Sequence, residues 1–283
     1  MNPQAPFWLV INSASGGNDE ASLAALRAAF DMAGCSPDRI VDCCDEALPD
    51  RAALEAAGVA ALAIFTGDGT ISTLVPTLEG WAGQVLVLPG GTANLLAKAL
   101  HGHQTAAELV AAFGHRALHP VQRHCVRFPG HIALIEVLAG PGATWSDVRE
   151  GLRDGDLAEV ASKTVEAVRQ SADGSKVAVI DPVLGRADGY AGVRLEPRSD
   201  GLMVDGYVSE TLGDYLKQGV ALLKRDFREG PHDELGQHSA LTCRTVDGAP
   251  IELMIDGERA VGPAEVWFEL SVLNVNLLAS THD

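Results

Sequence analysis

The chain has 283 residues, of which 47% are hydrophobic and 21% charged, and its formal net charge is −17. This length predicts about two domains, each able to bury its own core. The acidic balance argues against a nucleic-acid partner, because binding to a phosphate backbone requires a basic surface.

Targeting and redox signals are weak. No apolar run approaches the roughly 20 residues of a membrane-spanning helix, and residues 1–6 lack the basic start and apolar stretch of a secretory signal. Five cysteines (Cys35, Cys43, Cys44, Cys125 and Cys243) have no C-x-x-C spacing, which is typical of free thiols in a reducing compartment. We therefore expect a cytoplasmic protein without disulfides or zinc.

The first part of the chain alternates strand-like and helix-like segments. Short apolar runs predict strands, and longer amphipathic stretches predict helices. In chain order we expect a strand at 7–11, a helix at 19–33, a strand at 39–43, a helix at 49–57, a strand at 59–65, a helix at 70–79, a strand at 84–88, and helices at 92–100 and 105–113. Strands that alternate with helices specify a parallel sheet.

After about residue 120 the pattern changes to β-like runs, which predict a mainly antiparallel second domain. We expect strands at 121–128, 132–139, 176–181, 192–196, 202–209, 239–245, 251–255 and 265–273. Two helical stretches, at 146–169 and 210–227, interrupt them.

Three of the predicted strands run directly into glycine-rich turns that precede helices. The turns read Asn12-Ser13-Ala14-Ser15-Gly16-Gly17, Thr66-Gly67-Asp68-Gly69-Thr70 and Pro89-Gly90-Gly91-Thr92-Ala93-Asn94. Parallel strands place such turns along one edge of a sheet, where open α/β sheets bind ligands. Because glycine has no Cβ, the backbone at Gly67 and Gly69 can adopt positive φ and approach a charged ligand. Each turn alone is common between elements, but together they indicate a phosphate site.

Asp68 is the unusual residue of this arrangement. A carboxylate beside phosphates repels them unless it bridges through a metal ion or accepts a proton from an attacking hydroxyl. The chain has neither G-x-x-x-x-G-K-[ST] nor a G-x-G-x-x-G after the first strand. These absences exclude a P-loop enzyme and an ordinary Rossmann dehydrogenase.

These residues resemble the diacylglycerol kinase catalytic-domain family of lipid kinases, which includes bacterial lipid kinases and the sphingosine and ceramide kinases. The resemblance lies in the order and spacing of motifs from about residue 7 to the carboxyl end: Asn12 to Gly17, Thr66 to Thr70, Pro89 to Ala97, and Asp256-Gly257-Glu258. A further Asp200-Gly201-Leu202 is similar to the family's mid-domain turn.

The resemblance implies an α/β fold of two domains. Residues 1–120 would form a parallel α/β domain that binds ATP, residues 121–265 a mainly antiparallel β-sandwich that binds the substrate, and residues 266–283 would return to the first domain. It implies an ATP- and Mg²⁺-dependent kinase of lipid metabolism and phospholipid biosynthesis. The acceptor would be a lipid alcohol of the diacylglycerol, sphingoid-base or ceramide type, reached through a transient contact with a membrane surface.

The resemblance also assigns the site residues. Asp256 would accept the proton of the alcohol, Glu258 would orient Asp256 or hold a metal through water, and Asp68 would arrange magnesium and the γ-phosphate. The nucleotide would lie against Asn12, Ser13, Ser15, Gly16, Thr66, Gly67, Asp68, Gly69, Thr70, Gly90, Gly91, Thr92 and Asn94. Asp256-Gly257 also suits a hairpin turn, because D-G is a favoured turn dipeptide, and we interpret Asp247-Gly248 as only such a turn.

The chain departs from the family motifs at several positions. Ser13 replaces a proline and Thr66 a glycine, and both hydroxyls can donate to phosphate oxygens. Leu95 replaces an aspartate, which we expect to affect the choice of substrate more than activity. Pro197 occupies the place of an aspartate of the family's structural metal site, with Glu196 as a substitute ligand.

Two other functions stay open. NAD kinases share the G-G-D-G-T element and the two-domain plan, although the N-E motif with which they hold the nicotinamide nucleotide is absent here. A non-catalytic nucleotide-binding regulator would fit Leu95 and the incomplete metal site, whereas the presence of Asp68 and Asp256 argues against it. The sequence leaves the acceptor lipid and the oligomeric state open.

Overall fold

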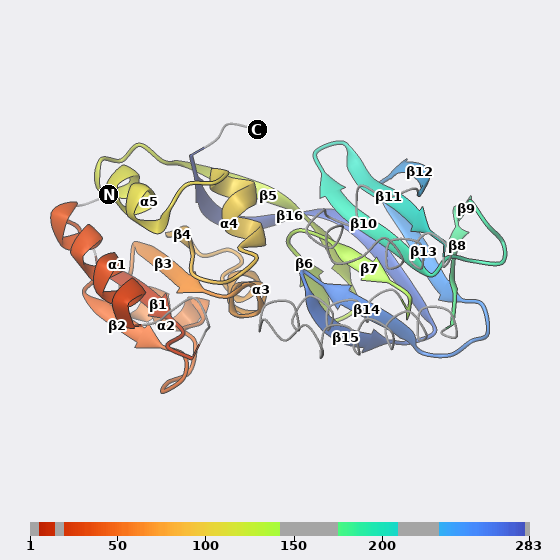
Figure 1. Cartoon of the computed structure of the whole chain (residues 1–283), viewed down its shortest axis with the longest axis horizontal. Coiled ribbons are helices and arrows are strands. Elements are labelled where there is room, and N and C mark those ends of the chain that lie inside the picture. Colours follow the sequence, from red (N-terminus) through yellow and green to blue (C-terminus); the bar gives the residue numbers. More distant parts are fainter. Residues whose placement is uncertain (1–5, 15–19, 142–174, 209–231, 281–283) are drawn as a thin grey trace. The chain divides into compact units, whose positions relative to one another are not determined.

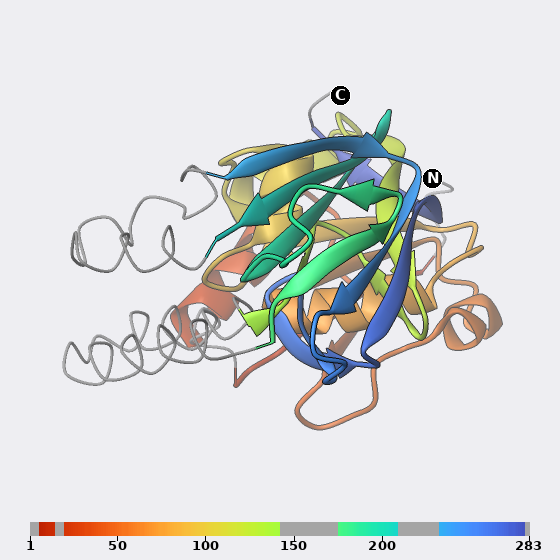
Figure 2. The same ribbon diagram turned by 90° about the vertical axis from the view of Figure 1, so that its right-hand side faces the viewer.

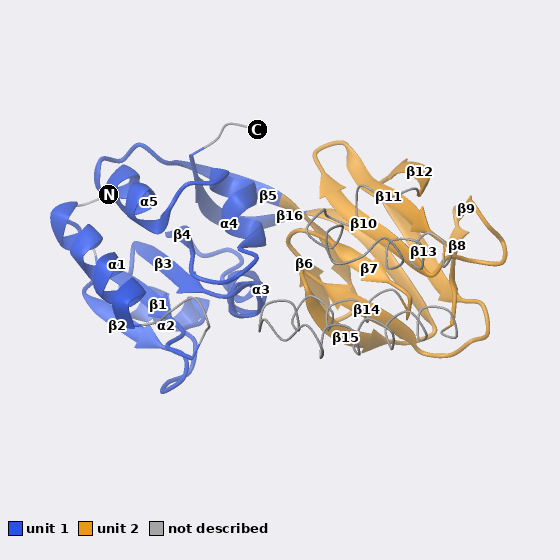
Figure 3. Ribbon diagram, viewed as in Figure 1, with its two compact units in different colours: residues 1–123, 272–283 blue, residues 124–271 orange. Residues whose placement is uncertain are grey.

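The computed structural model describes residues 6–14, 20–141, 175–208 and 232–280 (Figures 1 and 2). The chain divides into two compact units, residues 1–123 with 272–283 and residues 124–271 (Figure 3). The first unit contains a parallel sheet with helices, and the second contains antiparallel sheets. This confirms the predicted α/β class with a mainly antiparallel second part.

The first unit is built on parallel strands in the order β2-β1-β3-β4. Beside β4 lies the end of β16 (Glu265–Ala279), whose residues 272–279 belong to this unit. Its strands are β1 (Phe7–Ile11), β2 (Arg39–Asp42), β3 (Ala61–Thr66) and β4 (Gln84–Pro89). Its helices are α1 (Glu20–Met32), α2 (Arg51–Ala56), α3 (Asp68–Thr77), α4 (Leu95–His101) and α5 (Ala106–Gly114). None of the described helices is both long and apolar enough to cross a membrane.

Helices α1 and α5 pack on one face of this sheet. Phe30 of α1 and Phe113 of α5 both contact Phe7, with ring centroids 5.4 and 5.2 Å apart. The alternate side chains of the central strands point to the opposite face, and those at Leu62 and Val87 are fully buried there. Burial on both faces explains why β3 and β4 are continuous apolar runs rather than alternating ones.

Two helix boundaries differ from the predicted ones in a way that matters for function. Helix α3 begins at Asp68 and not at residue 70, so the last three residues of the T-G-D-G-T motif form its first turn. Helix α4 begins at Leu95 and not at residue 92, so the third glycine turn is longer than predicted. The other described elements of this unit begin and end close to their predicted residues.

The second unit contains two groups of mainly antiparallel strands. One is a six-stranded sheet in the order β12-β11-β10-β7-β14-β15, and the other runs β16-β13-β8-β9, with β5 paired to β16 and β6. The strands are β5 (His119–Phe128), β6 (His131–Ala133), β7 (Val137–Ala139), β8 (Val177–Asp181), β9 (Val183–Leu184), β10 (Gly192–Arg198), β11 (Gly201–Tyr207), β12 (Asp233–His238), β13 (Ala240–Thr245), β14 (Ile251–Ile255), β15 (Glu258–Gly262) and β16 (Glu265–Ala279). Buried residues of both groups, such as Val204 and Phe268, share one core.

Several strands differ from the prediction. The expected strand at 132–139 is two strands, β6 and β7, with a break at residues 134–136. Strands β9, β12 and β15 were not expected, because β9 is very short and β12 and β15 are polar strands at the ends of their sheet. The expected helices at 146–169 and 210–227 lie outside the described residues.

Candidate functional site

Three turns open on one edge of the sheet of the first unit. Strands β1, β3 and β4 are adjacent and parallel, with Ile11 beside Phe65 and Thr66 beside Pro89. The chain leaves all three at their carboxyl ends, so the structure brings the turns predicted from the sequence to the edge where α/β sheets bind ligands. The predicted residues Ser15 and Gly16 lie outside the described residues.

Asp68 joins the second turn to the third. Its Oδ2 accepts a hydrogen bond from the Asn94 amide at 2.9 Å, and its Oδ1 accepts one from the Leu95 amide at 2.6 Å. Asn94 is the N-cap of α4, but its own side chain makes no capping hydrogen bond. Asp68 therefore supplies the acceptors that the first amides of α4 need, and its negative charge suits a helix N-terminus.

The third turn is held by its own asparagine. Asn94 has a left-handed backbone (φ 52°, ψ 47°), its Oδ1 accepts from the Gly91 amide at 2.7 Å, and its Nδ2 donates to the Gly91 carbonyl at 2.8 Å. The Asn94 side chain thus stabilises the turn predicted to bind the nucleotide.

Glycines are needed here because two turns touch. A Cβ on Gly90 would lie 2.7 Å from backbone atoms of Phe65 and Thr66, and one on Gly91 would lie 2.8 Å from the Gly67 Cα. The expectation of positive φ at Gly67 is wrong, because its φ is −74°, and Gly69 lies within the helical first turn of α3. Close approach of backbones, and not left-handed conformation, therefore explains the glycines of the third turn.

The hydroxyl residues of the turns differ in exposure. Thr66 is fully buried and its Oγ1 donates to the Gly67 carbonyl, so this side chain stabilises the turn. Thr70 is half-buried, whereas Ser13 and Thr92 are exposed. Of the predicted hydroxyl ligands that the structure describes, Ser13 and Thr92 are therefore the most accessible.

The end of β2 also belongs to this edge, which the sequence did not indicate. Asp42 Oδ1 accepts hydrogen bonds from the amides of Ser13 at 3.3 Å and Cys44 at 3.1 Å. Burial by itself would raise the pKa of Asp42, but hydrogen bonds from Ser13 and Cys44 outweigh it and lower that pKa. The topology could have revealed this contact, because a parallel strand beside β1 must end next to the turn that follows β1.

In the second unit, Asp256 forms a hairpin turn, as its alternative interpretation predicts. Ile255 and Glu258 pair across β14 and β15, and Asp256 and Gly257 have φ values of 50° and 98°. Positive φ at both central residues is typical of a type I′ turn. Glu258, the predicted orienting or metal-binding residue, is exposed at the start of β15.

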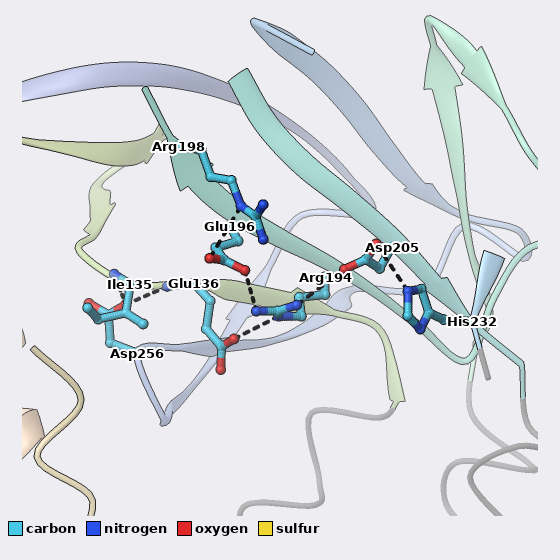
Figure 4. Close-up of polar contacts among 8 residues, drawn as sticks. All are labelled: Ile135, Glu136, Arg194, Glu196, Arg198, Asp205, His232 and Asp256. Atoms are coloured by element: carbon cyan, nitrogen blue, oxygen red, sulfur yellow. Dashed lines mark hydrogen bonds and ion pairs between the residues drawn. The ribbon is translucent and has the colours of Figure 1, made fainter. Parts of the chain in front are cut away.

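The Asp256 side chain points inward and binds the break between β6 and β7. It is 2% exposed. Its Oδ2 accepts from the Leu134 amide at 2.7 Å. Its Oδ1 accepts from the amides of Ile135 at 2.8 Å and Glu136 at 3.0 Å (Figure 4). The backbone thereby occupies most of the acceptor sites of this carboxylate, which favours a structural role. The role of Asp256 as acceptor of the alcohol's proton stays a prediction.

A buried ionic network adjoins Asp256 and was not anticipated. The Arg194 guanidinium binds Glu136 through Nε at 2.9 Å, Asp205 through Nη1 at 3.2 Å and Glu196 through Nη2 at 2.5 Å (Figure 4). The side chains of Glu136 and Asp205 are only 4% and 6% exposed. Burial alone would lower the pKa of Arg194, but the carboxylates, Glu136 foremost, raise it. The guanidinium therefore stays charged.

Part of the Arg194 network lies where the resemblance implies a structural metal site. Glu196, the substitute ligand, is bound by Arg194 and lies 3.5 Å from Nε of Arg198, so guanidinium groups flank its carboxylate. Asp200 is exposed in the turn between β10 and β11. Among the described residues, no group of three or more His, Cys, Asp or Glu side chains is placed to hold a metal ion.

Comparison with known proteins identifies one domain model and several similar folds. Residues 6–124 match the model of the diacylglycerol kinase catalytic domain. No curated protein shows a significant match to the chain.

Three of the similar solved structures come from Bacillus anthracis str. Sterne. Two structures, each provisionally named as a diacylglycerol kinase, superpose with TM-scores of 0.62 and 0.63 at 17% identity, covering 96% and 97% of this chain and 96% of theirs. A third, named as a diacylglycerol kinase, has a TM-score of 0.60 at 15% identity and covers 97% of this chain and 96% of its own. At such identities the likeness shows a shared fold.

Proposed function

The chain belongs, through residues 6–124, to the diacylglycerol kinase catalytic-domain family, and we propose that it is an ATP- and Mg²⁺-dependent kinase that phosphorylates the hydroxyl of a lipid alcohol. The observation that carries this proposal is the convergence of the three turns on one sheet edge, where Asp68 joins the second turn to the third. The family supplies the reaction class, and the geometry supports a site for phosphates.

The first unit suits the phosphates of a nucleotide. The N-terminus of α3, a helix of 10 residues, begins at the second turn and presents backbone amides there. Such amides and the positive end of the helix dipole bind anions. The exposed hydroxyls of Ser13 and Thr92 add donors on the first and third turns.

The donor set of this edge also suits Mg²⁺. In kinases this ion neutralises charge on the transferred phosphate. It is usually held by one or two carboxylates together with the phosphates, and not by a cage of protein ligands. Asp68 is a half-buried carboxylate at the edge, and two of its roughly four acceptor sites are used by backbone amides. We propose Asp68 as the residue that would hold the ion.

Phosphoryl transfer also needs a group that accepts the proton of the alcohol. The family resemblance favours Asp256, and Asp68 is the alternative. Asp256 accepts three backbone amides and Asp68 accepts two. Catalytic hydrogen bonds often rearrange when substrate binds, so both carboxylates stay candidates, and the contacts of Asp256 favour a supporting role for it.

The lipid class of the acceptor is inferred from the family and from the names of the similar structures. The net charge of −17 favours a neutral lipid over an anionic one, because a negative protein is repelled by an anionic membrane surface.

The proposal is tested by transfer of labelled phosphate from ATP and Mg²⁺ to a panel of diacylglycerol, ceramide, sphingosine, a crude lipid extract and NAD. We expect a chloroform-soluble labelled product, whose mobility identifies the acceptor. Label in NADP alone would instead establish an NAD kinase. The absence of any labelled product would indicate a binding role.

A further inference from the structure

Two adjacent cysteines lie at the proposed nucleotide edge, and the proposed function does not use them. Cys43 and Cys44, the thiol pair, directly follow β2. Strand β2 is parallel to β1 with Asp42 beside Ile11, and the Cys43 amide donates to the Ile11 carbonyl at 3.0 Å. The thiol pair is therefore held next to the turn that follows β1.

Cys44 contacts the first turn directly. Its Sγ donates a hydrogen bond to Asn12 Oδ1 at 3.2 Å. Its amide shares the Asp42 carboxylate with the Ser13 amide, at 3.1 and 3.3 Å. A group attached to this sulfur must therefore displace a contact of Asn12, which is predicted to bind the nucleotide.

Cys43 contacts the second turn and is the less accessible thiol. It is half-buried, and its side chain hydrogen-bonds with that of Thr70. Burial, followed by the charges of Cys44 and Asp42, raises the pKa of Cys43. Since the thiolate is the nucleophile, the raised pKa makes the Cys43 thiol less reactive than an ordinary cysteine. Cys44 is exposed, so a reagent in solution reaches it first.

We propose that Cys44 is a site of reversible modification by small-molecule disulfides, which blocks binding of a nucleotide to the adjacent turns. This inference rests on the proposed function. In the reaction, the Cys44 thiolate attacks one sulfur of a disulfide such as oxidised glutathione. A new S–S bond forms to Cys44, the original S–S bond breaks, and the departing thiolate takes up the proton that Cys44 released.

The product is a mixed disulfide and not a bond between the two cysteines. Adjacent Cα atoms across a trans peptide are about 3.8 Å apart, and the described chain has its cis bond elsewhere, at Asp181-Pro182. Disulfides usually require roughly 4.4–6.8 Å between Cα atoms. A Cys43–Cys44 disulfide would be strained, which leaves the adduct on Cys44 as the stable oxidised form.

The adduct competes with the nucleotide in two ways. It removes the S–H donor to Asn12 and places a bulky group over the first turn. A glutathionyl group also adds net negative charge beside the place proposed for phosphates, where like charges repel. We expect the affinity for MgATP to fall by at least about tenfold. Because coupling between two sites is reciprocal, bound nucleotide should protect Cys44 from the disulfide.

The test measures MgATP binding by calorimetry before and after treatment with oxidised glutathione, with the modified residue identified by peptide mass spectrometry. Treated protein should carry glutathione on Cys44, bind MgATP at least about tenfold more weakly, and recover after dithiothreitol. Each variant is compared with its own untreated form. Cys44→Ser, which keeps a donor to Asn12, should be insensitive to the treatment. Cys35→Ser, which removes a half-buried thiol elsewhere in the same unit, should respond like the parent.

Each other outcome has a distinct meaning. Unchanged affinity in protein that carries the adduct, or failure to modify Cys44 at all, overturns this inference and leaves the proposed kinase function standing. Failure of the untreated protein to bind MgATP overturns both.

Discussion

Asp68 and Asp256 have the same local sequence, an aspartate followed by glycine, and both carboxylates accept hydrogen bonds from backbone amides. Their surroundings differ. Asp68 is half-buried in the first turn of a helix at an open sheet edge, whereas Asp256 is 2% exposed in a hairpin and adjoins the Arg194 network. The same dipeptide thus lies at the proposed ligand edge in one unit and supports the backbone in the other.

The largest effect on stability is expected at Arg194. Arg194→Met keeps much of the side-chain length but removes the guanidinium that binds the buried carboxylates of Glu136 and Asp205. Removing one partner of a buried ion pair costs about 3–5 kcal/mol. Urea denaturation would measure this loss.

Arg198→Met is the control. The Arg198 side chain is 47% exposed, and among the ion pairs of the described residues it contacts Glu196 alone. Its expected cost is below about 1 kcal/mol. Equal costs for the two variants would mean that the network does not support the second unit.

A smaller loss of stability is expected at Asp256. Asp256→Asn has one acceptor oxygen in place of two, so at least one buried amide among those of residues 134–136 loses its partner. An unsatisfied buried donor costs about 1–3 kcal/mol. The midpoint of urea unfolding should fall accordingly.

Asp247→Asn is the matched control, because Asp247 also precedes a glycine in a turn but contacts exposed groups, Ser175 Oγ and the Ala249 amide. A change within about 0.5 kcal/mol is expected there. A stable Asp256→Asn variant that has lost phosphoryl transfer would support Asp256 as the residue that accepts the proton of the alcohol.

The core of the first unit should be sensitive to acid at His101. Burial lowers the pKa of this histidine from 6.5 to about 4. The unfolded chain therefore binds a proton between these pH values and the folded chain does not, so stability falls as pH decreases from 6.5 to about 4. The loss should be at most about 3–4 kcal/mol, and it should be absent above neutral pH.

Unfolding measured over this pH range would check the prediction. His101→Gln removes the titration and should flatten this part of the profile, whereas His103→Gln, at an exposed position, should leave it unchanged. An unaltered profile in His101→Gln would assign the acid sensitivity to other groups.

The first unit could largely be predicted from the sequence because its signals are local. Buried strands such as β3 are unbroken apolar runs, and each ends in a glycine turn, so topology alone brings the turns together. The contact of Asp68 with Asn94 could not be predicted, because it joins residues 26 positions apart through the exact start of α4.

The second unit was predicted less completely because its polar contacts are distant in sequence. The Asp256 carboxylate reaches an amide 122 positions away, and Arg194 reaches Glu136 across 58 positions. A partial signal existed, since Arg194 and Glu196 alternate with buried Val193 and Leu195 along β10 and so share the opposite face of the strand. This alternation did not reveal which charged side chains contact each other.

The most direct test of this account is phosphoryl transfer by Asp68→Asn, assayed with the acceptor that the parent enzyme phosphorylates and with folding checked by urea denaturation. We predict that transfer is lost while stability falls by only about 1 kcal/mol, the usual cost of a weakened helix cap. Retained turnover in a folded Asp68→Asn protein would contradict the proposal that Asp68 holds the metal ion at the sheet edge of the first unit.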